Sequence, residues 1–333
     1  MKAGRALVVS VLALCLLTVV GCGNGTGKSK TNPQPANAAT WTNTAGGISS
    51  YEIHSLAYDS GRNMLYASCS QSDSGQGVWK YDGTTWTDTA GGVLSSDVDP
   101  LSYDSGHNLL YAGTGSHGVW KYDGTTWTDT GGGMSNYEIG SLAYDSTHNL
   151  LYAGTGSDGV WKYDGTTWTD TGGGVSSFEI HSLAYDSGHN LLYAGTDHNG
   201  VWKYDGTTWT DTAGGVSGNY IFSLAYDSVH SQLYAGTYSG EGGVWKYDGT
   251  TWTDTRGGVS NYQIESLSYD SGHNLLYAGT GSHGVWKYNG ADWTNTGGGV
   301  SIYEIPALAY DSVHSRLYAG TWDHGVWSGN SDL

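Results

Sequence analysis

Aromatic residues stand directly before acidic residues at several places in the sequence, as in Tyr51-Glu52 and Phe178-Glu179. An aromatic plane can stack on the apolar face of a sugar or a peptide, while the carboxylate beside it orients the ligand by hydrogen bonds or attracts a cation. Two residues further on stands the residue whose type varies most, such as His54. We therefore predict ligand binding at these positions. The candidate residues are Tyr51, Glu52, His54, Asp99, Tyr137, Glu138, Phe178, Glu179, His181, Phe222, Tyr262, Glu265, Tyr303 and Glu304.

These positions recur because the chain is a tandem repeat. The motif Trp-Thr-(Asp/Asn)-Thr occurs seven times, beginning at Trp41, and Gly-Val-Trp also occurs seven times, ending at Trp327. A period of about 40 residues with several short β-rich segments is typical of propeller blades. Helical solenoids of similar period need an apolar pattern of about 3.6 residues, and the sequence lacks that pattern.

Each unit of the repeat contains four predicted strands, rich in Tyr, Trp, Val, Leu and Thr and separated by turn-forming residues. In one unit they are Ile139–Asp145, Leu150–Thr155, 159–164 and 167–171. The Asp164-Gly165 step between the last two strands favours a tight hairpin.

The two ends of the repeat region complete each other. Trp41 opens a fourth strand with no earlier strand of its unit before it, and Trp327 lies in a third strand with no fourth strand after it. We therefore predict an all-β fold, a seven-bladed β-propeller over residues 41–328 with four-stranded antiparallel blades and a tail at 329–333. The N-terminal strand joins the last blade, which closes the ring and removes exposed sheet edges.

The strands of a blade alternate in direction, so the connections divide between two faces. The turns after the first and third strands repeat nearly unchanged, and we interpret their face as scaffold. A His recurs in the first of these turns, but ligands of one ion must converge within about 2.0–2.6 Å, which copies in separate blades cannot do. We predict neither a metal site nor a cofactor. These histidines are His107, His148, His189, His230, His273 and His314.

The other face carries the candidate residues and every change of loop length, and binding commonly diversifies on such loops. Two alternatives stay open there. In the first, the aromatic rings bind no ligand and serve only to pack neighbouring blades together. In the second, a few His and Asp residues of the loops after the second strands meet across blades six and seven and bind a metal ion. The paired Trp residues, by contrast, are predicted to be structural.

The N-terminus has the pattern of an export signal over residues 1–21, with Lys2 and Arg5 before an apolar stretch. Val19-Val20-Gly21-Cys22 resembles a bacterial lipobox, which implies a lipidated Cys22 at the mature N-terminus. Residues 22–40 lack the apolar side chains needed to fold and are predicted to be a flexible tether. We therefore expect an exported protein, lipid-anchored to the cell envelope, in the outer membrane if the source is Gram-negative.

Charge and cysteine content narrow the partners further. The net charge is −18, so nucleic acid is an unexpected partner, since its readers carry the opposite charge. Cys15 leaves with the signal and Cys22 carries lipid, which leaves Cys69 without a disulfide partner. We interpret Cys69 as a small buried residue, and we expect a monomer.

The segments Leu151-Tyr-Ala-Gly-Thr and Gly159-Val-Trp-Lys-Tyr-Asp-Gly, with Trp168, resemble two kinds of propeller repeat. One is the two-component-regulator propeller of periplasmic sensor domains, and the other is the sialidase-type Asp-box (BNR) repeat. The second resemblance implies a sialidase, which needs an arginine cluster. Beyond the signal the sequence has only Arg62, Arg256 and Arg316, and two of these fall in scaffold turns.

No Ser/His/Asp nucleophile motif, phosphate-binding loop or redox Cys pair is recognised in the sequence. We predict no catalytic residues and a non-catalytic propeller that binds a protein, peptide, glycan or other ligand. The alternative is a multivalent lectin. A glycoside-acting enzyme with paired carboxylates such as Glu52 and Glu138 is the third possibility.

Overall fold

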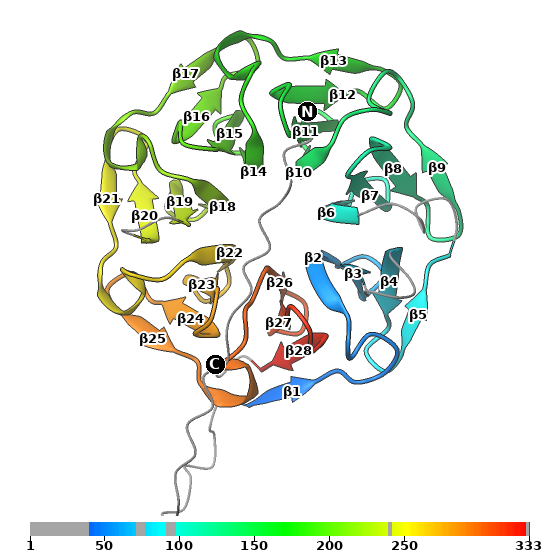
Figure 1. Ribbon diagram of the computed structural model, residues 1–333, viewed down its shortest axis with the longest axis vertical. Helices are drawn as coiled ribbons and strands as arrows, with labels where there is room; N and C mark the ends of the chain where they lie inside the picture. Colours follow the sequence, from blue (N-terminus) through cyan, green and yellow to red (C-terminus); the bar gives the residue numbers. More distant parts are fainter. Residues whose placement is uncertain (1–39, 71–76, 91–97, 239–241, 331–332) are drawn as a thin grey trace, which may run out of the picture. The chain divides into compact units, whose positions relative to one another are not determined.

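The computed structural model describes residues 40–70, 77–90, 98–238, 242–330 and 333. Within them, twenty-eight strands form seven four-stranded antiparallel sheets, which stand as blades around a ring (Figure 1). The prediction of an all-β, seven-bladed propeller is confirmed. No helix in these ranges is long and apolar enough to cross a bilayer. The predicted signal, Cys22 and the tether up to residue 39 lie outside the described residues.

The first strand of each blade lies nearest the centre of the ring and the fourth lies at the rim (Figure 1). Blades 1 and 2 comprise β2 (Glu52–Asp59), β3 (Met64–Ser70), β4 (Gly77–Tyr81), β5 (Trp86–Asp88), β6 (Val98–Asp104), β7 (Leu109–Thr114), β8 (Val119–Tyr122) and β9 (Trp127–Asp129). Blades 3 and 4 comprise β10 (Ile139–Asp145), β11 (Leu150–Thr155), β12 (Val160–Tyr163), β13 (Trp168–Asp170), β14 (Ile180–Asp186), β15 (Leu191–Thr196), β16 (Val201–Tyr204) and β17 (Trp209–Asp211). Blades 5 and 6 comprise β18 (Ile221–Asp227), β19 (Gln232–Thr237), β20 (Gly243–Tyr247), β21 (Trp252–Asp254), β22 (Ile264–Asp270), β23 (Leu275–Thr280), β24 (Val285–Tyr288) and β25 (Trp293–Asn295). Blade 7 comprises β26 (Ala307–Asp311), β27 (Arg316–Gly320), β28 (Val326–Gly329) and β1 (Trp41–Asn43).

The strand predictions hold closely in blade 3. β10 and β11 begin and end as predicted, whereas β12 and β13 are one residue shorter at each end. Asp164 leaves the strand because its Oδ1 accepts the backbone N–H groups of Thr166 and Thr167 at 2.8 and 2.7 Å. This side-chain turn, together with Gly165 at a φ of 96°, shapes the hairpin that the Asp-Gly step predicts.

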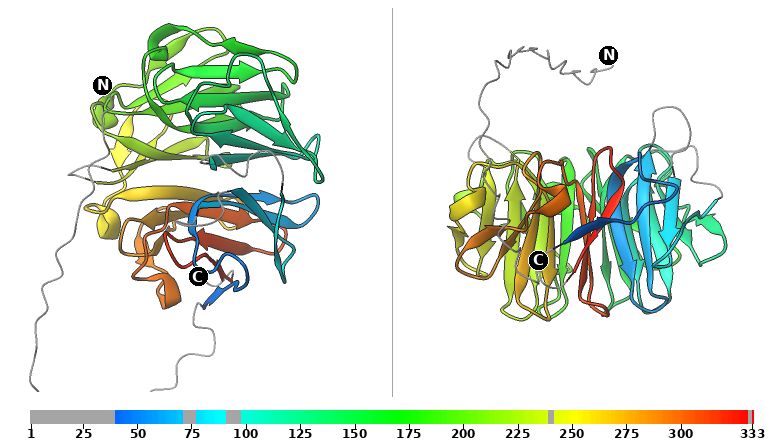
Figure 2. Two further views of the ribbon diagram at one scale, coloured as in Figure 1. Left: turned by 45° about the vertical axis from the view of Figure 1, so that its right-hand side comes forward. Right: turned by 90° about the horizontal axis from the view of Figure 1, so that it is seen from below.

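The N-terminal strand closes the ring as predicted. β1 pairs with β28, with Trp41 opposite Gly329 and Asn43 opposite Trp327, and Figure 2 shows blue β1 beside red β28. β28 extends to Gly329, one residue past the predicted end of the propeller. Leu333 of the predicted tail is buried in the hydrophobic cluster between blades 6 and 7.

A hydrogen-bond relay links each fourth strand to the fourth strand of the preceding blade. In blade 3, Trp168 donates its indole N–H to the Thr130 hydroxyl at 3.0 Å, and Thr130 donates to the Val119 carbonyl at 2.7 Å. These Trp residues are therefore structural, and the relay runs through the closing strand. The seven Trp–Thr bonds are Trp41–Thr296, Trp86–Thr44, Trp127–Thr89, Trp168–Thr130, Trp209–Thr171, Trp252–Thr212 and Trp293–Thr255.

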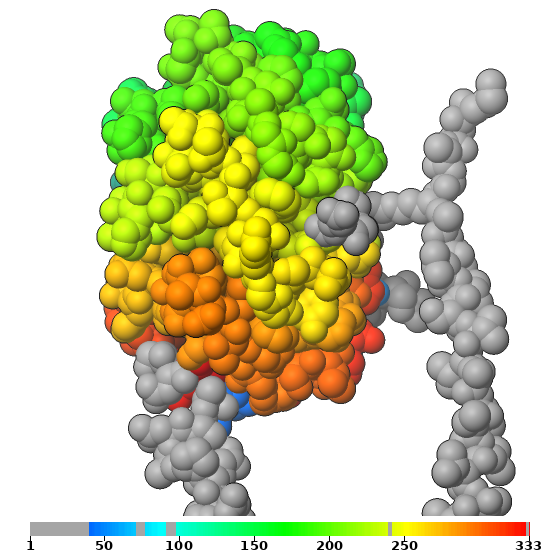
Figure 3. Space-filling model, turned by 90° about the vertical axis from the view of Figure 1, so that its left-hand side faces the viewer, coloured from blue at the N-terminus to red at the C-terminus, as the bar shows by residue number. Residues whose placement is uncertain are grey.

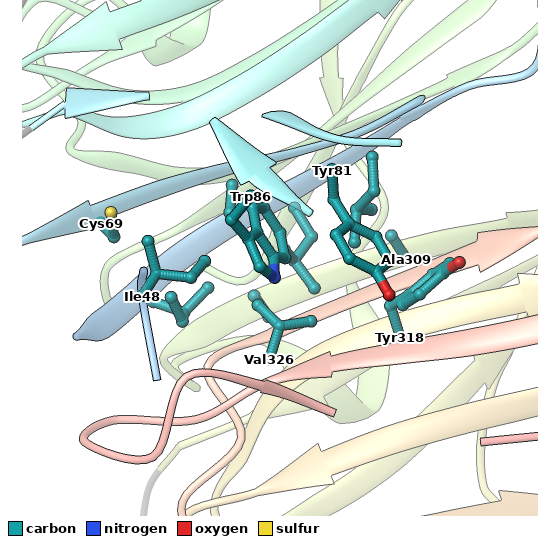
Figure 4. Packing of buried hydrophobic residues seen from close by; sticks show 12 residues of the cluster. Ile48, Cys69, Tyr81, Trp86, Ala309, Tyr318 and Val326 are labelled. Atoms are coloured by element: carbon teal, nitrogen blue, oxygen red, sulfur yellow. The ribbon is translucent and has the colours of Figure 1, made fainter. Parts of the chain in front are cut away.

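The hydrophobic core lies between blades rather than at the centre of the ring. In Figure 4, Ile48 and Trp86 meet Tyr318 and Val326 of blade 7 in one buried cluster. Blades 4 to 6 follow one another along the outer surface, from green to orange (Figure 3). Cys69 is buried, and burial raises the pKa of its thiol to about 12. It replaces a Thr of the other blades, as expected.

Candidate functional site

The connections after the second and fourth strands form what we call the variable face. Three positions of a blade lie together on this face. In blade 3 the first two are Glu138 and Gly140, on either side of the buried Ile139, and the third is Gly156, which follows Thr155. In blade 4 the second position, His181, lies at a β-bulge between Ile180 and Ser182. The Asp197 N–H donates to the Glu179 carbonyl at 3.2 Å, which holds the third position opposite the first. We call these three positions the inner triplet. The described inner triplets are Glu52/His54/Ser70, Glu138/Gly140/Gly156, Glu179/His181/Asp197, Tyr220/Phe222/Tyr238, Gln263/Glu265/Gly281 and Glu304/Pro306/Trp322.

His54 of blade 1 contacts its own triplet and both neighbouring blades. Its Nε2 lies 2.8 Å from the Ser70 hydroxyl, and its Nδ1 lies 3.3 Å from Oδ1 of Asp99 in blade 2. Its ring meets Trp322 of blade 7 edge-on, with centroids 5.7 Å apart. A carboxylate can only accept, so neutral His54 carries its proton on Nδ1, and Nε2 accepts from Ser70.

Ser70, His54 and Asp99 form a string of contacts that was not predicted from the sequence. Its atoms follow the order of a Ser-His-Asp triad, which is recognised by geometry rather than by position in the chain. The sequence gives no motif for it, because the three residues belong to different strands of two blades. The Ser70 hydroxyl also lies 3.4 Å from Oε2 of Glu52, a second acceptor for its proton.

Blades 4 and 5 join their triplets into an aromatic cluster. The His181 ring stacks on Tyr220 and Phe222, with centroids 4.6 and 5.6 Å away. Phe222 in turn stacks on Tyr238 at 5.0 Å. His181 and Phe222 were predicted site residues, but Tyr220 and Tyr238 were missed as members of the site. Only the fold shows that they share an inner triplet.

Blades 6 and 7 bring two carboxyl groups together. Glu265 and Glu304 share a hydrogen bond, and burial together with the charge of Glu304 raises the pKa of Glu265 to about 8. Burial also raises the pKa of Glu304, and the charges of Asp323 and Glu52 act in the same direction. The two carboxyl groups therefore titrate as a coupled pair that holds protons to higher pH than isolated Glu side chains do.

The raised pKa of Glu265 makes a testable stability prediction. In the unfolded chain Glu265 ionises near its ordinary pKa of 4.5, so its contribution to stability is complete below that pH and is lost as the pH rises towards 8. Glu265→Gln removes this loss. We expect it to raise the free energy of unfolding by about 2–4 kcal/mol at pH 8 and to change little at pH 4. Urea denaturation at both pH values measures this, and an equal effect at both would contradict the assignment.

Carboxylates continue around the variable face. Burial raises the pKa of Glu179, and the charges of Asp197 and Glu138 raise it further. Burial likewise raises the pKa of Tyr238, with added effects from Glu265 and Glu304. Negative groups from adjacent blades thus lie close enough to affect one another. Like charges held together in this way favour the binding of a cation.

Five of the predicted site residues are aromatic residues in the connections between blades. Each of them contacts the Trp in the third strand of the blade that follows its connection. Tyr51 meets Trp79 with centroids 5.9 Å apart, and Phe178 meets Trp202 at 5.7 Å. These contacts resemble the staple alternative, although they lie within one blade rather than between two. The remaining pairs are Tyr137–Trp161, Tyr262–Trp286 and Tyr303–Trp327.

The recurring histidines of the scaffold turns each pair with a buried Asp in their own turn. In blade 3, His148 Nδ1 lies 2.7 Å from Oδ2 of Asp145.

In the loops of blades 6 and 7, His283 stacks on Tyr262 and His324 stacks on Tyr303. Within the described ranges, the one group of side chains placed to share a metal ion lies instead in blade 4, and it consists of Glu179, His181 and Asp197.

Two cavities lie on the scaffold face, between neighbouring blades. One of about 320 Å³ lies between blades 5 and 6, where Gln232 starts the second strand, and one of about 70 Å³ lies between blades 7 and 1, beside Arg316. Gln232 and Arg316 occupy the first position of the second strand, where most blades have Leu. This face is the predicted scaffold face, and cavities were not expected there, because one polar substitution per site forms no motif that could be recognised.

No protein-family model and no curated protein matches the chain. Among solved structures, the chain is similar to the extracellular domain of BT4673 from B. thetaiotaomicron, with a TM-score of 0.70 and 19% identity over 88% of this chain and 40% of that one. It is also similar to the GH74 xyloglucanase from Xanthomonas campestris, with a TM-score of 0.67 and 16% identity over 87% and 53% of the two chains. The WD40 repeats of RRP9 give a TM-score of 0.69 at 14% identity, over 88% of this chain and 99% of that one. The chain thus spans about half or less of the first two proteins, and the likeness shows a shared propeller fold.

Proposed function

We propose that this protein is a non-catalytic ligand- or protein-binding propeller, displayed on the cell envelope as a lipoprotein, which binds a cationic ligand or peptide on its variable face. The observation that carries the proposal is the gathering of carboxyl groups there from separate blades, with raised pKa values at Glu179, Glu265 and Glu304. A cation would relieve their mutual repulsion, and the rings of Tyr238 and Trp322, both exposed, offer faces for cation–π contact.

Export and anchoring rest on the N-terminal pattern, with its apolar stretch and Cys22. The extracellular domain of BT4673 shares the fold, which agrees with a propeller that works outside the cytoplasm. The sensor-type repeat resemblance supports a binding role in the same way. Labelling with a radioactive fatty acid, lost in Cys22→Ser, tests the anchor separately from ligand binding.

The binding proposal predicts a face-specific loss of affinity. Glu-to-Gln changes at positions 52, 138, 179 and 304 should weaken binding of an oligolysine peptide at least tenfold, and binding of the unaltered protein should fall as salt rises. Calorimetry in EDTA measures both. The matched control changes Asp to Asn at 82, 123, 164 and 205 on the other face, where Asn289 shows that an amide can hold the same turn. Equal losses in the two variants, or no binding by the unaltered protein, would refute a cation-binding variable face.

The lectin alternative predicts binding on a glycan array with one site per blade. The glycosidase alternative predicts turnover of a glycoside that the same Glu-to-Gln changes abolish. Glu265 and Glu304 are hydrogen-bonded, closer than the carboxyl separations of about 5 Å or more that glycoside hydrolysis uses. The Ser70–His54–Asp99 string favours one further activity, acyl hydrolysis. If a fluorophosphonate probe labels Ser70, the protein is a hydrolase and the non-catalytic proposal is wrong.

A further inference from the structure

The inner triplet of blade 4 brings three metal-ligating side chains together at the ends of two paired strands. Glu179 lies directly before β14, and His181 is its second residue, at the β-bulge between Ile180 and Ser182. The Asp197 N–H donates to the Glu179 carbonyl, so these two residues are cross-strand neighbours. One ligand atom from each of the three residues lies within 4.8 Å of the others.

Two atoms of this triplet are buried without a hydrogen bond. His181 Nε2 and Asp197 Oδ1 are both inaccessible to solvent and have no hydrogen-bond partner. Glu179 Oε1 lies 3.6 Å from His181 Nε2, and His198 Nε2 lies 3.1 Å from Asp197 Oδ1. Buried polar atoms are nearly always paired, because leaving one unpaired costs about 1–3 kcal/mol. An ion between these atoms would satisfy both.

The electrostatics of the triplet suit a divalent cation. The side chain of His181 is largely buried, and its Nε2, which has no hydrogen-bond partner, can offer a lone pair to an ion. Glu179 and Asp197 add two carboxylates, whose oxygen atoms are ligands for divalent cations. The stacked rings of Tyr220 and Phe222 hold the imidazole in place.

Blade 1 provides an internal comparison. Its triplet has Glu and His at the same two positions, but Ser70 stands where blade 4 has Asp197. There both nitrogens of His54 have partners, Ser70 and Asp99. The two blades share a fold and differ in one ligand residue, and only the blade with Asp leaves its His nitrogen unpaired among the described residues.

We propose that Glu179, His181 and Asp197 bind one divalent transition-metal ion, with zinc the best match. Zinc takes imidazole nitrogen and carboxylate oxygen at about 2.0–2.2 Å, so a small inward rotation of the three side chains brings them into range. His198, beside Asp197, is placed either to orient that carboxylate or to supply a fourth ligand. This site goes beyond the proposed function and does not depend on it.

Titration of the metal-free, untagged full chain with zinc chloride tests the site. We expect one ion per chain by calorimetry, a rise in the melting temperature with zinc, and at least tenfold weaker binding in His181→Ala. Asp197→Ser should cause a similar loss, and because it copies the blade 1 triplet it should fold. His54→Ala in blade 1 and His189→Ala in a scaffold turn are matched controls that should keep full affinity.

The result that overturns the site is specific to blade 4. No zinc binding by the unaltered chain, or binding that both His181→Ala and Asp197→Ser retain within twofold, rules it out. A cobalt-substituted sample gives an independent readout, since the visible spectrum of Co²⁺ reports its ligands and should change in Asp197→Ser. The oligolysine assay runs in EDTA, so failure of either proposal leaves the other intact.

Discussion

Trp41→Ala is expected to lower the free energy of unfolding by about 3–5 kcal/mol, the usual cost of deleting a buried Trp side chain. Trp41 is 7% exposed and donates its indole N–H to Thr296 of blade 6 at 3.1 Å. It also belongs to a strand of only three residues that pairs with β28. The substitution therefore removes packing and a hydrogen bond from the strand that closes the ring.

Trp168→Ala is the matched control, because Trp168 makes the equivalent bond to Thr130 inside blade 3. We expect the two variants to lose similar stability in guanidinium denaturation. Only Trp41→Ala should make the N-terminal strand sensitive to protease in the native state, since β1 is held by few other contacts. If Trp41→Ala unfolds like the unaltered protein and keeps its strand protected, closure by β1 does not stabilise the ring. Trp41→Phe serves if the alanine variant fails to fold.

The fold was predictable because every repeat has the same pattern of strand and turn residues. The Asp-Gly hairpins, the alternation of strands and the complementary ends at Trp41 and Trp327 together allow few other arrangements. β28 ends at Gly329, one residue later than predicted, because the end of a strand depends on its partner. The partner of β28 is β1, which is some 290 residues away in the sequence.

The site was predictable only in part. Positions such as His54 and Glu265 could be found because they vary among otherwise repeated units. Their partners could not, because contact between His54 and Asp99 depends on how far one blade is rotated against the next. Tyr51 and Phe178 lie on Trp residues for a similar reason: the backbone turn before the first strand directs them back onto their own blade.

Duplication gives this chain an internal standard for judging residues. Identical residues such as Trp168 and Thr130 recur at every blade interface, and their contacts recur with them. The residues that differ, such as Ser70 and Asp197, change the local chemistry while the register beside them stays the same, with Ile53 opposite Cys69 in blade 1 and Ile180 opposite Thr196 in blade 4. Chemical function is therefore best sought where one blade departs from its neighbours.

Raising the pH above 10 is expected to unfold the protein cooperatively before pH 12. Burial, with added effects from nearby Asp residues, raises the pKa of Tyr66, Tyr111, Tyr152 and Tyr193 to about 12. In the unfolded chain these phenols ionise near 10.0, so their contribution to stability is complete below pH 10 and is lost between pH 10 and 12. Two pH units amount to about 3 kcal/mol for each tyrosine, and four such residues approach the whole stability of a typical domain.

Far-ultraviolet circular dichroism and tyrosinate absorbance at alkaline pH should therefore change together. Tyr111→Phe keeps the buried ring but removes the phenol, so we expect it to move the midpoint to higher pH, and Tyr111→Phe with Tyr193→Phe to move it further. Stability at pH 7 should change far less, because the phenol is neutral in both states there. Tyrosinate absorbance that develops near pH 10 while the dichroism stays native, and that the double variant reduces, would mean that Tyr111 and Tyr193 reach solvent within the folded ring, which their 5% and 4% exposures argue against.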